Sequence, residues 1–244
     1  MLTAGVDLAA ESKGTALAVL EWRESLATVR DLQLGVDDAR IVETAVRVDK
    51  LGIDCAFGWP DEFVGFLTAH ANHETSPRVD GGMDWRRTLA YRETDREIRR
   101  RTGRWPLSVS TDRLGLTAMR CAGLLARIQE AGVEVDRSGA SLVVEVYPGA
   151  SLRMWGFTTT GYRANADSRA ALLHAVRGSA PWLDVGGFGE LMVASADAFD
   201  AVIAALAARN AALGAYDGPP AELIDRARRE GWIALPTGRL DDLV

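Results

Sequence analysis

Three apolar stretches near the start of the chain have the length and pattern of consecutive β-strands. Residues 2–8 and 14–20 are nearly continuous apolar runs, and residues 26–34 alternate apolar with polar positions. A period of two is typical of a half-buried strand, and a short apolar run is typical of a fully buried one. Because the connections are short, we expect the three strands to pair as an antiparallel meander.

The pattern then changes to a helix followed by further strands. Asp37 and Asp38 precede a stretch of helical periodicity at 39–48, and a short apolar run follows at 51–55. A strand that is reached through a helix commonly lies parallel to an earlier strand, so we expect 51–55 to lie beside the first strand. Residues 141–146 form a fifth run of the buried type.

Helical patterns occupy most of the remaining chain. Ser110 or Thr111 is expected to cap one of these helices and Ser195 another, while residues 72–84 form a polar loop. No repeat or linker divides the sequence, so we predict a single domain over 1–244 with a helical, arginine-rich insertion at about 73–110. The predicted helices span 60–70, 91–101, 112–131, 168–176, 196–213 and 221–230.

Composition narrows the class of protein. The chain has 244 residues, of which 48% are hydrophobic, and this is the balance of an ordinary globular protein. Its two cysteines lie far apart in the sequence, which favours the reducing cytoplasm over secretion. No run approaches the roughly 20 apolar residues that span a bilayer, so we expect no membrane association.

The charge distribution argues against a protein that coats nucleic acid, because the net charge is -6. However, eight arginines lie between Asp84 and Arg104 against four acids. This segment could be a solvated helix, or its arginines could meet phosphates or buried acids. The candidate substrate-binding residues are Arg92, Arg96, Arg99 and Arg100.

Carboxylates occur where the predicted core strands end. Asp7 and Asp54 close two strands that should be neighbours, and ligands of open α/β sheets usually bind at this edge. Asp197 and Asp200 share one face at the start of the helix 196–213, whose alanines would allow close approach to the sheet. Glu145 lies within an apolar strand and is either a further ligand or the partner of an arginine such as Arg92 or Arg96.

Several carboxylates in one place repel each other unless a cation neutralises them. Mg²⁺ or Mn²⁺, which prefer oxygen ligands, would do so, and the candidate metal ligands are Asp7, Asp54, Asp197 and Asp200. Two such ions could align a water molecule and stabilise the leaving oxygen of a phosphodiester. The pattern therefore points to metal-dependent hydrolysis of a nucleic acid or nucleotide.

The order of these motifs resembles the ribonuclease H-like superfamily, and the segment from Asp197 to Ala201 is similar to the metal-binding helix of Holliday-junction resolvases. More closely, four segments over residues 2 to about 235 resemble domain-of-unknown-function family 429, whose members are described as predicted nucleases of this fold. The resemblance implies an α/β fold with a five-stranded mixed sheet in the order 3-2-1-4-5 and helices on both faces. The four segments are Gly5-Val-Asp7-Leu-Ala, Ile53-Asp54-Cys-Ala-Phe-Gly58-Trp-Pro60, Tyr91-Arg-Glu-Thr-Asp95-Arg96 and Val144-Glu145-Val-Tyr-Pro148.

Two other functions are compatible with the same pattern. Actin-like and sugar-kinase domains share this core and also begin with a Gly-x-Asp strand, so transfer of a phosphoryl group from ATP is an alternative. Those proteins resemble two such domains in tandem, and a homodimer of this chain would supply the second. The remaining alternative is a binding protein without catalytic activity, because a fold does not determine a function.

Overall fold

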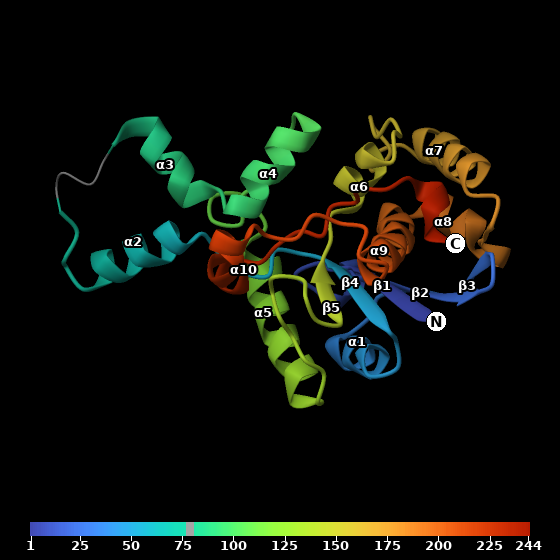
Figure 1. The fold of residues 1–244 in the computed structure, drawn as a ribbon, viewed down its shortest axis with the longest axis horizontal. Helices are drawn as coiled ribbons and strands as arrows, with labels where there is room; N and C mark the ends of the chain where they lie inside the picture. Colours follow the sequence, from blue (N-terminus) through green and yellow to red (C-terminus); the bar gives the residue numbers. More distant parts are fainter. Residues whose placement is uncertain (77–80) are drawn as a thin grey trace.

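A six-stranded mixed sheet forms the centre of the protein, in a computed structural model that describes residues 1–76 and 81–244 (Figure 1). The strands β1 (Leu2–Asp7), β2 (Ala16–Arg23) and β3 (Leu26–Leu34) form the expected antiparallel meander. Their buried and partly buried positions alternate most clearly in β3, where the sequence alternates. The protein therefore has an α/β fold built on a mixed sheet.

The other three strands are parallel to their neighbours. The strand β4 (Lys50–Asp54) lies beside β1, and β5 (Val143–Glu145) lies beside β4. The prediction of five strands was wrong by one, because β6 (Leu183–Asp184) pairs with β3 and gives the order β5-β4-β1-β2-β3-β6. A strand of two residues is too short for its apolar pattern to be distinguished from a loop.

The helix α9 (Ala196–Ala212) lies across one face of the sheet at close range (Figure 1). Two strand glycines that are register partners, Gly5 and Gly52, lie directly under it. A Cβ atom at Gly52 would stand 2.7 Å from the carbonyl oxygen of Ala204, and one at Gly5 would overlap the backbone at Ala201. Because neither strand carries a side chain there, the helix backbone rests on the strand backbone.

Two helices cover the opposite face, and two more complete the layer around α9. The helices α1 (Asp38–Ala45) and α5 (Gly115–Glu130) pack on the apolar residues of β1 and β4 that point away from α9. On the α9 side, α7 (Ala166–Ser179) and α8 (Gly189–Ala194) pack on β2 and β3. The short helix α6 (Pro148–Met154) follows β5 and contacts α9.

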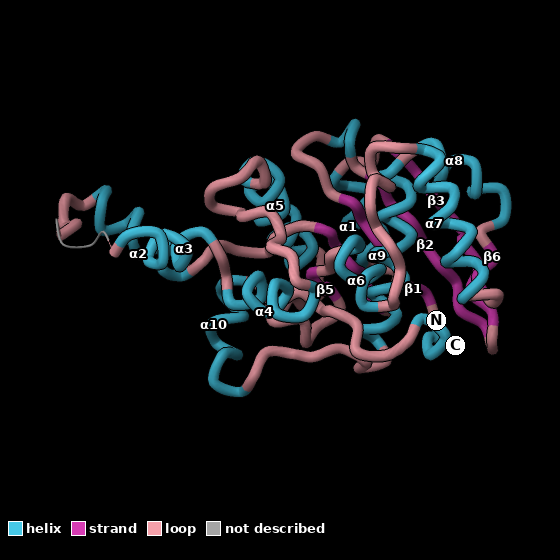
Figure 2. Tube along the Cα trace, turned by 90° about the horizontal axis from the view of Figure 1, so that it is seen from above, coloured by secondary structure: helices cyan, strands magenta, loops and turns pink. Residues whose placement is uncertain are grey.

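The helices α2 (Asp61–Ala71) and α3 (Gly82–Ala90) project from the body of the protein (Figures 1 and 2). They pack on each other through Phe66 and Trp85, and neither has a buried residue. The predicted loop 72–84 was wrong at its end, because α3 begins at Gly82, while residues 77–80 lie outside the described part of the chain.

Two more helices connect these projecting helices to the body. The arginine-rich helix α4 (Glu93–Thr102) ends at Gly103, whose φ of 71° allows the turn. Near the carboxyl terminus, α10 (Ile224–Glu230) follows a short 3-10 helix, so the predicted helix 221–230 is divided. Within residues 1–76 and 81–244, the helices lack the combination of length and apolar content needed to cross a bilayer.

Of the two predicted helix caps, one is confirmed and the other was wrong. Ser195 caps α9 as expected, since its Oγ accepts a hydrogen bond from the amide of Ala198 at 3.1 Å. By contrast, neither Ser110 nor Thr111 caps α5, which begins at Gly115. The amides of both residues donate to the Oγ of Ser108 instead. These residues therefore form a hydrogen-bonded turn, and the helix begins after it.

Candidate functional site

Asp7 and Asp54 lie side by side at the carboxyl ends of β1 and β4. They are register partners in this parallel pair, two residues after Gly5 and Gly52 respectively. Side chains two positions apart in a strand point to the same face. Because the two glycines face α9, Asp7 and Asp54 also face α9.

The first turns of α9 bring two more carboxylates to this edge. Asp197 lies in the first turn and is partly exposed, whereas Asp200 is fully buried at the sheet side of the helix. The close contact of α9 with the strand glycines fixes the height of these acids above Asp7. The structure therefore brings together the four aspartates that the sequence suggested as metal ligands.

A loop between α6 and α7 supplies two residues that the sequence patterns did not indicate. The guanidinium of Arg163 contacts Asp7 at 3.3 Å, Asp197 at 3.0 Å and also Asp200. The hydroxyl of Tyr162 donates to the Oδ1 of Asp200 at 2.8 Å. Both residues lie in an irregular polar stretch, where neither periodicity nor a strand end marks a position that faces the core.

The carboxylates of Asp7, Asp54 and Asp200 hold protons more tightly than isolated aspartates. Burial raises the pKa of Asp7 to about 8 and that of Asp200 to about 6. The pKa of Asp54 is raised as well, first by burial and then by the charges of Asp7 and Asp200. Arg163 lowers the pKa of all three, but a single guanidinium faces four carboxylates.

The chemistry of these donors fits a hard divalent cation, because all four are carboxylates. The guanidinium of Arg163 lies between three of these carboxylates and bonds each of them. In the arrangement of residues 1–76 and 81–244, no three acidic, histidine or cysteine side chains are positioned to hold a metal ion together. The cluster thus has suitable ligands, with an arginine between them.

Glu145 lies apart from the four aspartates because of the pleat of the sheet. It pairs in register with Ile53, whose side chain packs on the α1 and α5 face. Its carboxylate accepts hydrogen bonds from Arg92 at 2.8 and 2.9 Å and from the amide of Phe57 at 3.0 Å. Of the two roles weighed for Glu145, the structure places it as the partner of an arginine.

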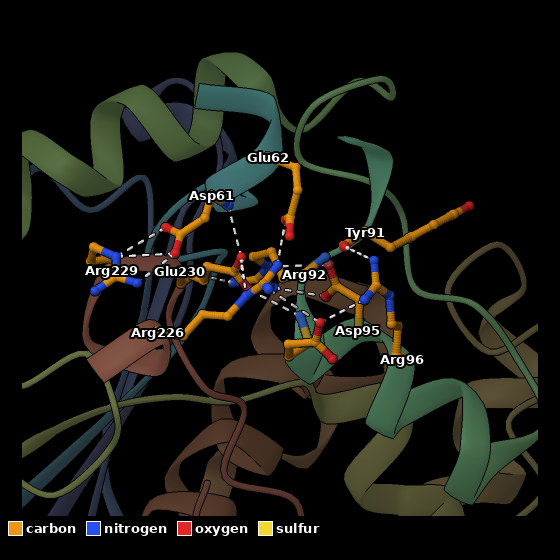
Figure 3. Close-up of polar contacts among 10 residues, drawn as sticks. Asp61, Glu62, Tyr91, Arg92, Asp95, Arg96, Arg226, Arg229 and Glu230 are labelled. Atoms are coloured by element: carbon orange, nitrogen blue, oxygen red, sulfur yellow. Dashed lines mark hydrogen bonds and ion pairs between the residues drawn. The ribbon is translucent and has the colours of Figure 1, made fainter. Parts of the chain in front are cut away.

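The Arg92 side chain is buried rather than available at the surface, contrary to its expected role in substrate binding. Besides Glu145, it bonds both carboxylate oxygens of Asp95 and the carbonyl oxygen of Glu230. Burial of a guanidinium requires such partners, because an unpaired charge is costly away from water. Figure 3 shows Arg92 with Asp95 and Glu230, and the neighbouring ion pairs among α4, α10 and the start of α2.

The other three arginines of the candidate substrate-binding set lie along α4. Arg96 is half-buried and bonds Glu93 at 2.6 Å, and Arg100 is exposed and bonds Glu97 at 2.8 Å (Figure 3 shows Arg96). Arg99 is exposed and contacts the carbonyl oxygen of Gly103. Ion pairs between residues three apart on α4 therefore offset the repulsion between like charges four apart. Within the described chain, none of these three arginines contacts the aspartate cluster.

Comparison with known proteins gives a family but no characterised relative. Neither a curated protein nor a solved structure matches this sequence. A family model does match, over residues 5–223, and it covers the second half of β1 with Asp7 and the whole of β4, β5 and α9. Its description is "Protein of unknown function (DUF429)". The chain therefore belongs to the DUF429 family.

Proposed function

We propose that this protein is a divalent-metal-dependent nuclease that hydrolyses phosphodiester bonds. The observation that carries the proposal is the convergence of four aspartates from three separate segments at one edge of the sheet. Buried carboxylates need partners, and within the described residues the four aspartates of this cluster have Arg163 as their single cationic partner. Buried carboxyl groups that outnumber their cationic partners in this way are typical of sites that bind cations.

Asp7, Asp54, Asp197 and Asp200 would hold Mg²⁺ or Mn²⁺. Ions bound by these residues would supply an activated water molecule and stabilisation of negative charge on the phosphate oxygens. The residues themselves orient the site: Tyr162 holds one oxygen of Asp200, and the strand pairing of β1 with β4 fixes Asp7 beside Asp54.

The topology of the sheet fits this proposal, and the phosphoryl-transfer alternative would share it. Three antiparallel strands, followed by β4 and β5 parallel to β1, have the topology expected for a ribonuclease H-like core. On that core the acids of β1, β4 and a late helix would be the catalytic ones. The proposed class is therefore a nuclease of the ribonuclease H-like superfamily.

The surface charge favours a compact substrate. The net charge is -6, and the arginines of α4 are largely engaged with neighbouring acids. Long, unspecific binding to a nucleic acid backbone needs many free cationic contacts. A structured, branched or short nucleic acid, or a nucleotide, needs fewer, so we propose substrates of that kind.

Cleavage of defined substrates tests this function. Purified protein is incubated with labelled RNA, DNA, RNA–DNA hybrid and branched DNA, with Mg²⁺, with Mn²⁺ or with EDTA. We expect metal-dependent cleavage of at least one substrate, lowered at least about 100-fold by Asp7→Asn, because even indirect changes at metal ligands cost 10–100-fold.

Asp167→Asn is the matched control, because Asp167 is an exposed aspartate at the start of α7, outside the cluster. It removes the same charge and should cleave at the wild-type rate. Equal activity of Asp7→Asn and wild type would rule out the proposed site.

A further inference from the structure

Arg163 occupies the centre of the aspartate cluster. Its Nη2 lies 3.3 Å from Asp7 and 3.0 Å from Asp197, and its Nη1 contacts Asp200. Within the described part of the chain, no other cationic side chain forms an ion pair with these three residues. The guanidinium therefore lies where the carboxylate oxygens of both strand and helix converge.

The backbone around Arg163 is held in place by a second arginine, Arg169. This residue is buried, and its guanidinium donates to the carbonyl oxygens of Tyr162 at 2.7 Å and Arg163 at 3.3 Å. It also donates to the carbonyl oxygens of Val193 and Ala194, which directly precede the cap of α9. Arg169 thus joins the loop to the start of α9, and the backbone of Arg163 is held in a fixed position beside the cluster.

The Arg163 side chain itself can leave the cluster. It is 49% exposed, whereas the Asp200 side chain beneath it is 1% exposed. An arginine side chain has several rotatable bonds, and this one can turn to water without movement of its backbone. Its contacts are therefore exchangeable, unlike those of the enclosed Arg92, whose side chain is 4% exposed.

A guanidinium and a divalent cation would compete for the same oxygens. With Arg163 in place, four carboxylates share one positive charge, and a divalent ion would neutralise more of that charge. An ion can bind only to those molecules in which Arg163 has left the site. Its apparent affinity is therefore the intrinsic affinity multiplied by the fraction of protein in which the site is free. The competition would thus set the affinity of the site.

We infer that Arg163 is an exchangeable internal counter-ion, whose guanidinium occupies the position of a divalent cation among Asp7, Asp197 and Asp200 and is displaced when the ion binds. This inference rests on the proposed metal-dependent function. It adds that the chain carries its own competitor for the ion, and that the competitor stabilises the metal-free protein.

Titration with Mn²⁺ alone tests the inference without an activity assay. Binding to metal-free wild type, Arg163→Gln and Arg163→Lys is measured by calorimetry, and melting temperatures are measured in EDTA. Arg163→Gln should bind Mn²⁺ at least about tenfold more tightly and melt at a lower temperature in EDTA. Arg163→Lys keeps one charge in a different shape, so its affinity should lie between those of the other two.

Arg177→Gln is the control, since Arg177 is an exposed arginine on α7 outside the cluster, and it should behave as wild type. If wild type binds Mn²⁺ and Arg163→Gln binds it equally or more weakly, the inference fails while the metal site stands. If neither protein binds Mn²⁺, both the metal site and the inference are wrong. Circular dichroism of Arg163→Gln confirms that the comparison is made on folded protein.

Discussion

Asp7 illustrates how a single buried carboxyl group makes the stability of the protein depend on pH. Its carboxyl is buried beside the three other aspartates of the cluster, and burial raises its pKa to about 8. An aspartate in the unfolded chain has the ordinary value near 3.8. Between these two values the folded protein binds the proton that the unfolded chain releases, so the contribution of Asp7 to stability decreases as the pH rises.

The melting temperature of the metal-free protein should show this pH dependence. At pH 5, just above the ordinary value, only a small part of this contribution is lost, and Asp7→Asn should melt slightly higher than wild type. At pH 9 Asp7 is charged, so Asp7→Asn should melt higher than wild type, with each kcal/mol gained worth about 2–4 °C in a chain of this size. Thermal melts in EDTA at both values measure the difference.

Comparison of the two proteins at each pH cancels the titration of all other groups that the variant leaves unchanged. Asp167→Asn, which changes an exposed aspartate, should show no such growing difference. A lower melting temperature of Asp7→Asn at both pH values would show that the charged carboxylate of Asp7 stabilises the folded protein, the opposite of the expected effect.

At the scale of the elements, the contact between α9 and the sheet positions the site. Gly5 and Gly52 let the helix backbone rest on β1 and β4, and the acids follow two residues later in each strand. The helix is buried on nearly all sides and has alanine at most positions that meet the strands. The distance between Asp200 and the strand acids thus depends on residues that have no reactive group.

Gly5→Ala should therefore be strongly destabilising. Its Cβ would overlap the backbone of α9, which cannot rotate away as a side chain could. We expect a loss of about 3 kcal/mol or more in the free energy of unfolding, the upper end of the cost of overpacking. Denaturant unfolding measures this loss.

The matched control is Gly65→Ala on α2, where an added Cβ meets no atom within 4 Å. Alanine is the better helix former, so this variant should gain about 0.5–1 kcal/mol locally. Equal stability of Gly5→Ala and wild type would show that α9 does not lie as close to the sheet as described.

At the scale of the whole molecule, Glu230 joins the projecting helices to the body. Its buried carboxylate accepts hydrogen bonds from the amide of Asp61 at 2.8 Å and from that of Glu93 at 3.0 Å (Figure 3). These amides belong to the first residues of α2 and α4, where a negative charge also complements the helix dipole. Arg226 completes the junction with a contact of 2.8 Å to Glu230.

Glu230→Gln should loosen this junction while leaving the sheet intact. The amide retains one acceptor oxygen, so its other group would face an N–H donor or Arg226 without a bond. Hydrogen bonds to charged groups contribute about 1.5–3 kcal/mol. We expect faster hydrogen exchange in the first turns of α2 and α4 and unchanged exchange in β1 and β4, measured by mass spectrometry.

Glu222→Gln changes an exposed glutamate that precedes α10 and should leave the exchange unchanged. Faster exchange throughout the sheet of Glu230→Gln would mean that the junction supports the whole fold. In that case the projecting helices and the sheet would form one cooperative unit rather than two.

Much of this protein could be predicted from local sequence pattern. Apolar runs and one alternating segment identified β1 to β5, and the acids that end β1 and β4 indicated the edge of the sheet at which the four aspartates meet. Ser195 and the alanines after it marked α9 as a helix that could approach the sheet. These features depend on residues within a few positions of each other, and the chain therefore carries them independently of its fold.

Only the tertiary structure decided which charges meet. The carboxylates of Asp7 and Glu145 both end strands, but the register of β5 turns Glu145 to the opposite face and to Arg92. Arg163 has no local feature that distinguishes it from the other arginines, and it reaches the site because Arg169 anchors its loop beside α9. Electrostatic partners are chosen by distance in space, and a sequence read along one dimension does not contain that distance until the chain has folded.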